Sequence, residues 1–180
     1  MIGQEYQWKT WQHKWIIGKS RTCIYLSKAI LSSATSAALF LLFQLIALFS
    51  SGQISNILTS GYVAMIICGL AIYTALGVVI CLLSMLIKNN TTSIIVCICY
   101  VLFSETVWSA IRNLSSISSS VMKIVEFGIW HSIYGMSMII SSTSLSADMA
   151  VNIVINSVVI MFIATMFGLI VFRKYELWNG

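Results

Sequence analysis

The feature that most constrains this chain is a run of 59 residues, from Ala29 to Ile87, without a single Asp, Glu, Lys or Arg. One bilayer crossing needs about 20 apolar residues, so the run is long enough for two crossings and a turn. Only 8% of the 180 residues are charged and 59% are hydrophobic, whereas soluble domains carry about 25% charged residues. The composition excludes a water-soluble globule, including a soluble nucleotide-binding or nucleic-acid-binding domain.

Four apolar stretches are predicted to cross the bilayer as helices. They are residues 29–50, 62–87, 92–111 and 150–172. At 1.5 Å per residue, each reaches about 30 Å or more, which is the thickness of the hydrocarbon core. Gly69 and Gly77 lie inside the second stretch, where glycines allow neighbouring helix backbones to approach closely. The predicted fold class is an all-α, polytopic transmembrane helix bundle with residues 29–180 as its membrane domain.

Residues 112–149 form a long connection before the last span, and their apolar middle part raises the question of a fifth crossing. Lys123, Glu126 and His131 lie within that part. Each charged side chain near the middle of a bilayer costs about 2.5 to 3.5 kcal/mol. A short re-entrant or amphipathic helix avoids most of this cost, so we predict such a helix on the external side.

The basic residues predict how the spans are oriented. Eight of the ten lie in residues 1–28, in the turn at Lys88, or at the end of the last span at Arg173 and Lys174. Because Lys and Arg are enriched in cytoplasmic loops, all three segments are predicted to be cytoplasmic. Both termini then lie inside the cell, which requires an even number of spans and favours four.

Glu105 is the single charged residue within the predicted spans. A carboxylate inside a membrane segment suggests a functional role, and for Glu105 the hypothesis is a position on a substrate path. The alternative is structural, because Arg112 lies two helical turns further on roughly the same face. Small residues in the first span, such as Ser33 with Ala37 and Ala34 with Ala38, favour close helix contact within the chain or with a second copy.

The sequence contains no pattern typical of a catalytic or metal centre. The five cysteines show no CxxC spacing, and the two histidines, His13 and His131, are far apart. A structural zinc site needs four ligands, usually Cys and His. No GxSxG or HExxH motif is present. We therefore expect no enzymatic activity, no bound metal and no cofactor in this chain.

Residues 1–28 form a basic, tryptophan-rich segment before the first span. Trp8, Trp11 and Trp15 alternate with lysines, which is typical of an amphipathic element lying at the level of the lipid head groups. We predict a cytoplasmic interfacial helix that can also contact an acidic partner surface.

The order of residues in this segment resembles a motif of ABC-2 type transporter permeases, E-x-x-x-G-T-W followed by S-R and L-x-K. The matching positions are Glu5, Thr10, Trp11, Ser20, Arg21, Leu26 and Lys28, with Lys9 at the place of the glycine. The chain ends on a pattern similar to the family's terminal F-x-K-x-x-L, at Phe172 to Leu177. The bacitracin and lantibiotic-immunity permeases are members of the resembled group. Relative to the usual six spans, the chain is expected to lack the first two.

The resemblance implies a permease subunit of an ATP-driven exporter of peptides or amphiphiles, in a bacterial plasma membrane. Its partners would be a separate ABC ATPase subunit and a second permease, as a homodimer or heterodimer, and no nucleic acid. In the family the matching segment carries the coupling helix, which implies ATPase-coupling roles for Glu5, Thr10, Trp11, Ser20, Arg21 and Lys28. The alternative is a membrane scaffold or regulatory protein of four helices that transports nothing and uses the same surface segment to bind a partner.

Overall fold

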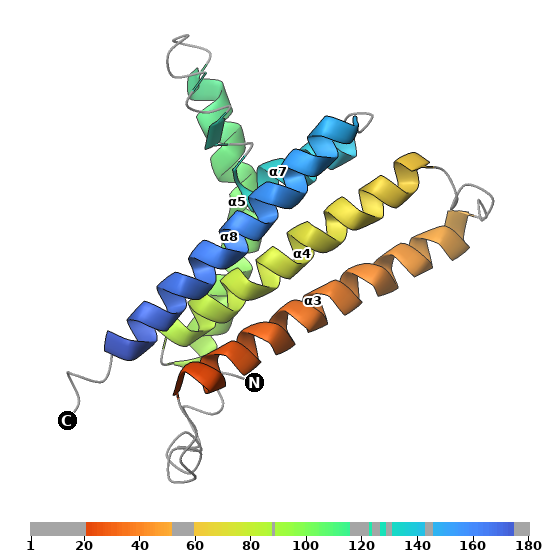
Figure 1. Ribbon diagram of the computed structural model, residues 1–180. Helices are drawn as coiled ribbons and strands as arrows, with labels where there is room; N and C mark the ends of the chain where they lie inside the picture. Colours follow the sequence, from red (N-terminus) through yellow and green to blue (C-terminus); the bar gives the residue numbers. More distant parts are fainter. Residues whose placement is uncertain are drawn as a thin grey trace.

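The computed structural model describes residues 21–51, 60–87, 89–115, 123, 127–128, 131–142 and 146–174. This part of the chain is helical and contains no strand, which confirms the all-α class. Its helices are α3 (Arg21–Ser51), α4 (Ser60–Leu86), α5 (Asn90–Ser115), α7 (Ile133–Ser142) and α8 (Ala147–Lys174), shown in Figure 1.

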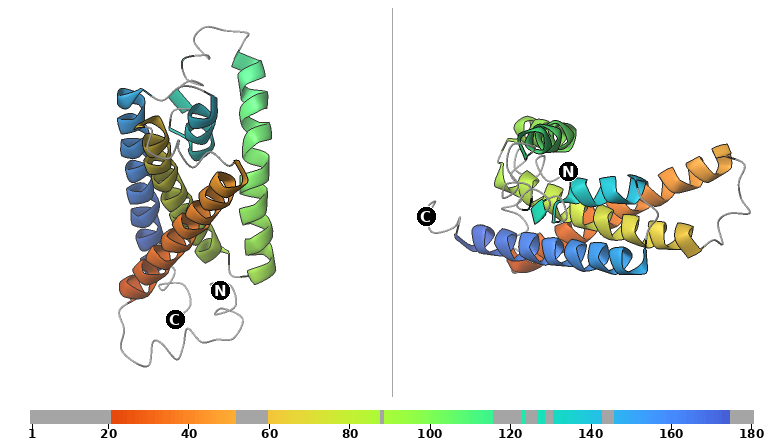
Figure 2. Two further views of the ribbon diagram at one scale, coloured as in Figure 1. Left: turned by 90° about the vertical axis from the view of Figure 1, so that its right-hand side faces the viewer. Right: turned by 90° about the horizontal axis from the view of Figure 1, so that it is seen from above.

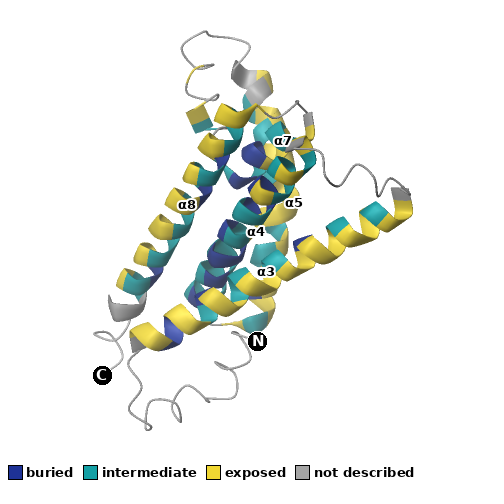
Figure 3. Ribbon diagram, turned by 45° about the vertical axis from the view of Figure 1, so that its right-hand side comes forward, coloured by how far each residue is buried: buried dark blue, intermediate teal, exposed yellow. Residues whose placement is uncertain are grey.

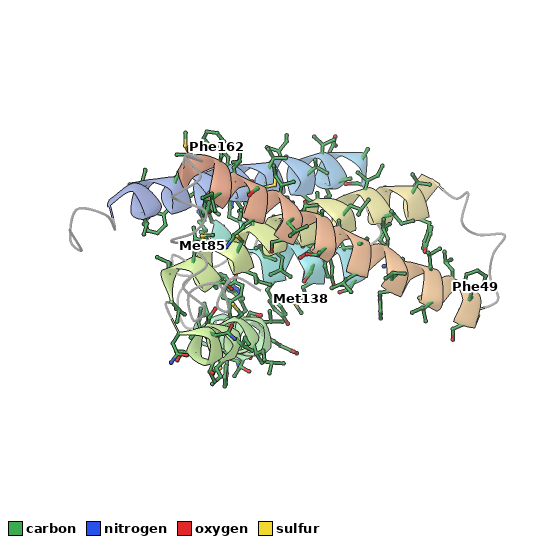
Figure 4. All side chains as sticks on the ribbon, turned by 90° about the horizontal axis from the view of Figure 1, so that it is seen from below. Phe49, Met85, Met138 and Phe162 are labelled. Atoms are coloured by element: carbon green, nitrogen blue, oxygen red, sulfur yellow. The ribbon has the colours of Figure 1, made fainter. Side chains whose placement is uncertain are left out.

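Within the described residues, α3, α4, α5 and α8 are long and apolar enough to cross a membrane, and each matches one of the four predicted spans, with α4 ending one residue before the predicted end. Large apolar side chains cover their outer surfaces. Phe49 and Phe162, for example, are 76% and 63% exposed and point away from the bundle (Figure 4). A soluble monomer rarely exposes contiguous apolar surface of this extent, whereas lipid chains cover it at no cost. The fold is therefore a helix bundle of the membrane type.

The helix of the first span begins at Arg21 and not near Ala29, where the span was predicted to begin. Residues 21–28, assigned from sequence to the surface segment, form about two turns of α3. They contain no glycine or proline that would break a helix, and Ile24 and Tyr25 are buried within the bundle. The surface segment and the first span are thus joined without a break in the helix at Lys28.

Side chains just before three of the helices cap their first turns. The side-chain oxygen of Asn89 accepts a hydrogen bond from the Thr91 backbone amide before α5, at 3.1 Å. The Ser132 hydroxyl does the same for the amide of Gly135 in α7, at 3.0 Å, and that of Ser146 for Met149 in α8, at 3.3 Å. Such caps satisfy amides that have no partner in the helix, so these helix starts are encoded locally.

Helix α4 lies at the centre of the bundle, in contact with α3, α5, α7 and α8. Figure 3 shows its buried residues along much of its length. One apolar cluster joins α4 to α7 and α8, and contains Cys68, Ile72, Ile133, Met136 and Ile153. A second cluster joins α4 to α3, and contains Tyr25, Ala29, Cys81 and Met85, with Leu169 of α8 packed against it.

Helix α7 is a short element in the connection between α5 and α8. Its ten residues span about 15 Å, half the thickness of a hydrocarbon core, so α7 is too short to cross a bilayer. Met136 is fully buried, and the Ser157 hydroxyl of α8 lies 3.9 Å from its sulfur atom. A short helix within the long connection was predicted, and α7 is docked by its side chains against α4 and α8.

Glycines allow α3 to approach α4 closely. A Cβ atom on Gly77 would lie 2.7 Å from the backbone oxygen of Ser32 and 2.8 Å from the Cα of Ser33. The Ser32 hydroxyl donates to the Gly77 carbonyl at 2.8 Å. At Gly69 the ring of Phe40 occupies the space where a side chain would be. The close helix contact predicted from small residues is therefore made within the chain, on the face that carries Ser33.

Helix α5 stands apart from the other long helices. It meets α4 near the end where α4 finishes and leans away from α3 and α8 toward its own C-terminal end (Figures 1 and 2). Near its start, Ser93 is buried, and the Cys97 thiol lies 3.8 Å from the Ser84 hydroxyl of α4. In the most apolar 18-residue stretch of α5 no residue is buried, compared with 39% in α4.

Candidate functional site

The predicted ATPase-coupling site falls largely outside the described residues. Glu5, Thr10, Trp11 and Ser20 lie in residues 1–20, which the structure does not describe. Arg21 is the first residue of α3. The described part of the predicted site is therefore the first two turns of α3, from Arg21 through Lys28.

Lys28 lies on the side of α3 that faces the bundle, where it is half-buried. Its ammonium group is close enough to the buried thiol of Cys81 in α4 to act on it electrostatically. A lysine so near the end of a span can keep its charge near the head-group region while its methylene chain packs against apolar surface. Lys28 thus lies beside the part of α3 that packs against α4 through Tyr25 and Ala29.

Tyr25 forms the main contact between the start of α3 and the end of α8. Its side chain is fully buried, and its hydroxyl donates to the Ala164 carbonyl of α8 at 3.4 Å. A Cβ atom on Gly168 would overlap the Tyr25 ring and its hydroxyl oxygen. The ring also belongs to the apolar cluster that contains Cys81 of α4. One side chain of α3 therefore contacts both α4 and α8.

These contacts lie at the end of the bundle where the predicted cytoplasmic segments meet. The start of α3, the end of α4 and the end of α8 share this end (Figure 2). The arrangement places the basic residues at the termini of α3 and α8 on the same side of the membrane domain. The opposite end carries α7 and the acidic first turn of α8 at Asp148.

Glu105 lies on α5, in the half of the helix that leads away from this end, and it is exposed. In the described part of the chain no hydrogen bond or ion pair reaches its carboxylate. The neighbouring hydroxyls of Ser104 and Ser109 donate to carbonyls of their own helix, at 2.7 Å and 2.9 Å. The structure thus does not bring Glu105 together with Lys28 or Tyr25, and the two candidate regions are separate.

Sequence reasoning missed Tyr25 and Gly168, which connect the surface segment to the last span. Tyr25 was not singled out, because an aromatic residue in a basic segment is typical of an interfacial anchor. The available signal was the glycine in the otherwise bulky stretch Met166–Ile170, since such a glycine marks close approach of another group. Which side chain approaches it depends on the packing of α3 against α8.

The described residues contain no group of three or more His, Cys, Asp or Glu side chains arranged to hold a metal ion. All five cysteines are free thiols. No protein-family model, curated protein or solved structure matches this chain.

Proposed function

We propose that this protein is the membrane-spanning permease subunit of an ATP-binding-cassette exporter, with ATP hydrolysis on a separate subunit. The motif from Glu5 to Lys28 supports an ATPase-binding role for the N-terminal segment. The proposal places the protein in a bacterial plasma membrane with both termini in the cytoplasm. Its substrates are peptides or amphiphiles, and its assembly includes a second permease chain.

The observation that supports this proposal best is the burial of Tyr25 between helices. A coupling segment must pass a movement on to the membrane domain, and a helix attached to one neighbour alone would bend or slide. Tyr25 lies near the C-terminal end of this segment, and its ring packs against Gly168 in α8 and within the cluster that contains Cys81 in α4. A displacement of the first turn of α3 would therefore act on three spans together.

Copurification tests the proposal directly. The full-length protein is expressed with the genes that surround it and isolated from membranes, and bound proteins are assayed for ATP hydrolysis. We expect an ATPase to copurify with the wild type and to be lost with the charge reversals Glu5→Arg and Arg21→Glu. The matched control is Asp148→Arg, which reverses an acidic residue at the opposite end of the bundle and leaves ATPase binding unchanged.

Two outcomes contradict the proposal. One is the absence of any ATPase from the wild-type preparation, which favours the scaffold alternative. The other is a bound ATPase that is retained in both charge-reversed variants, which excludes the N-terminal segment as its binding site.

A further inference from the structure

The exposed side of α5 combines a carboxylate with an apolar stripe. Ile95, Ile98, Leu102 and Glu105 follow one another at spacings of three, four and three residues, which places them on one face of the helix. All four are exposed. The opposite face, with Ser93 and Cys97, is the one that contacts α4.

Glu105 lies within the candidate span of α5, and an unpartnered charge inside a membrane span is costly. It is about 9 Å from Ile111, the end of the candidate span, at 1.5 Å per residue. A carboxylate in this region loses part of its hydration, and acidic groups in membrane segments are normally paired or face water. No ion pair within the described residues neutralises it. A positively charged group from outside the chain would recover the lost interaction.

Glu105 lies nearer the end of the span at Ile111 than the three apolar residues do. This order favours a molecule whose polar head lies toward that end of α5. Leu102 lies about 4.5 Å deeper in the span than Glu105, and Ile95 lies about 15 Å deeper. An amphiphile in one leaflet has its charged head near the surface and its apolar part toward the middle of the bilayer. Its head would meet Glu105 while its apolar part lies along Leu102, Ile98 and Ile95.

We propose that this face of α5 binds a cationic amphiphile, with its positive head on Glu105 and its apolar chain along Ile95, Ile98 and Leu102. The inference rests on the proposed function in one respect, since it names the substrate class of the exporter. A zwitterionic lipid fits less well, because its phosphate repels the carboxylate that its amine attracts. Net positive charge is therefore the property that this surface selects.

The test measures equilibrium binding of radiolabelled dodecyltrimethylammonium to the full-length protein in phosphatidylcholine nanodiscs, with empty nanodiscs as the baseline. We expect saturable binding that Glu105→Gln weakens about fivefold or more, the scale of one ion pair partly removed from water. Asp148→Asn is the matched control, because it removes an exposed carboxylate on another helix. We expect this control to bind as the wild type does.

A second measurement needs no variant. Dodecyl maltoside, which carries the same chain on a neutral head, should compete about tenfold or more less effectively than unlabelled dodecyltrimethylammonium, because it lacks the charge. Equal competition by the two amphiphiles, or equal binding by the Glu105→Gln and wild-type proteins, overturns the inference. Equal weakening by Asp148→Asn also overturns it, since that result indicates a general effect of net charge.

The assay contains no ATPase, so its outcome is independent of the copurification test. Amphiphile binding at Glu105 without ATPase association would support the amphiphile site and contradict the exporter proposal. ATPase association without amphiphile binding at Glu105 would support the exporter proposal and contradict this substrate class.

Discussion

Helices α4 and α5 have similar lengths and are both apolar enough to span a membrane, but only α4 is surrounded by other helices. The difference lies in the residues that permit close approach. Helix α4 carries Gly69 and Gly77, which receive Phe40 and the backbone of α3 at Ser32. Helix α5 contains no glycine. In a membrane, where apolar side chains gain little from leaving lipid, such surface complementarity decides which helices associate.

Polar groups in the two helices also have different surroundings. The Ser32 hydroxyl of α3 reaches across to Gly77 of α4, and the Tyr62 hydroxyl of α4 lies 3.4 Å from the side-chain oxygen of Gln44. On α5 the Ser104 and Ser109 hydroxyls bond within their own helix. Interhelical polar contacts thus reinforce the glycine-mediated packing around α4, whereas the Ser104 and Ser109 hydroxyls add no hydrogen bond between α5 and another helix.

The largest loss of stability is expected when the space at Gly77, where α3 packs against α4, is filled by a side chain. We expect Gly77→Val to reduce the free energy of unfolding by about 3 kcal/mol, because its side chain would meet the α3 backbone, which cannot move aside locally. Unfolding in mixed detergent micelles, followed by circular dichroism, measures the change. Gly61→Val is the control, since nothing lies within 4 Å of a Cβ atom there. A loss at Gly77 no larger than at Gly61 would contradict close packing at this crossing.

Truncating one apolar residue in each helix compares their burial directly. Ile72 of α4 is 2% exposed, and Leu102 of α5 is 67% exposed. We expect Ile72→Ala to lower the free energy of unfolding by about 2 kcal/mol, because it leaves a cavity. Leu102→Ala should change it by less than about 0.5 kcal/mol, as for other exposed sites. Equal losses in the same unfolding assay would show that α5 is packed as tightly as α4.

Filling the space at Gly168 tests the contact between α3 and α8. We expect Gly168→Ala to cost about 1.5 kcal/mol, less than the change at Gly77, because the obstacle is the Tyr25 ring and a side chain can yield more than a backbone. The cost should fall markedly in a Tyr25→Leu background, measured as a double-mutant cycle. Additive effects of the two substitutions would mean that the residues do not interact.

The smallest effect is expected from removing the Tyr25 hydroxyl. Its hydrogen bond to the Ala164 carbonyl is long, at 3.4 Å, and the ring supplies most of the contact. We expect Tyr25→Phe to lower the free energy of unfolding by about 0.5 kcal/mol, toward the low end of the range for one hydrogen bond. A loss above about 2 kcal/mol in the micelle assay would assign the main role to the hydroxyl.

The four spans were determined by the sequence because length and hydrophobicity suffice for a helix to cross a bilayer, and the described helices match all four to within one residue at the end of α4. Local sequence also encodes helix starts such as those at Asn89 and Ser146, since their side chains cap the turn that follows them. A close contact at Gly69 and Gly77 was likewise predictable from the glycines. Glu105 was identified as the single charge within the spans, and the residues from Glu5 to Ser20 stay a prediction.

The pairing of helices was decided by the tertiary structure. The sequence contains four similar apolar helices, and hydrophobicity cannot rank their partners when lipid is an equally good neighbour. Only the packing shows that Tyr25 meets Gly168, which lies far along the chain, and that α4 is central while α5 stands apart. It also shows that the Glu105 carboxylate lies on an exposed face of α5, because the direction of a side chain depends on which side of its helix the neighbours cover.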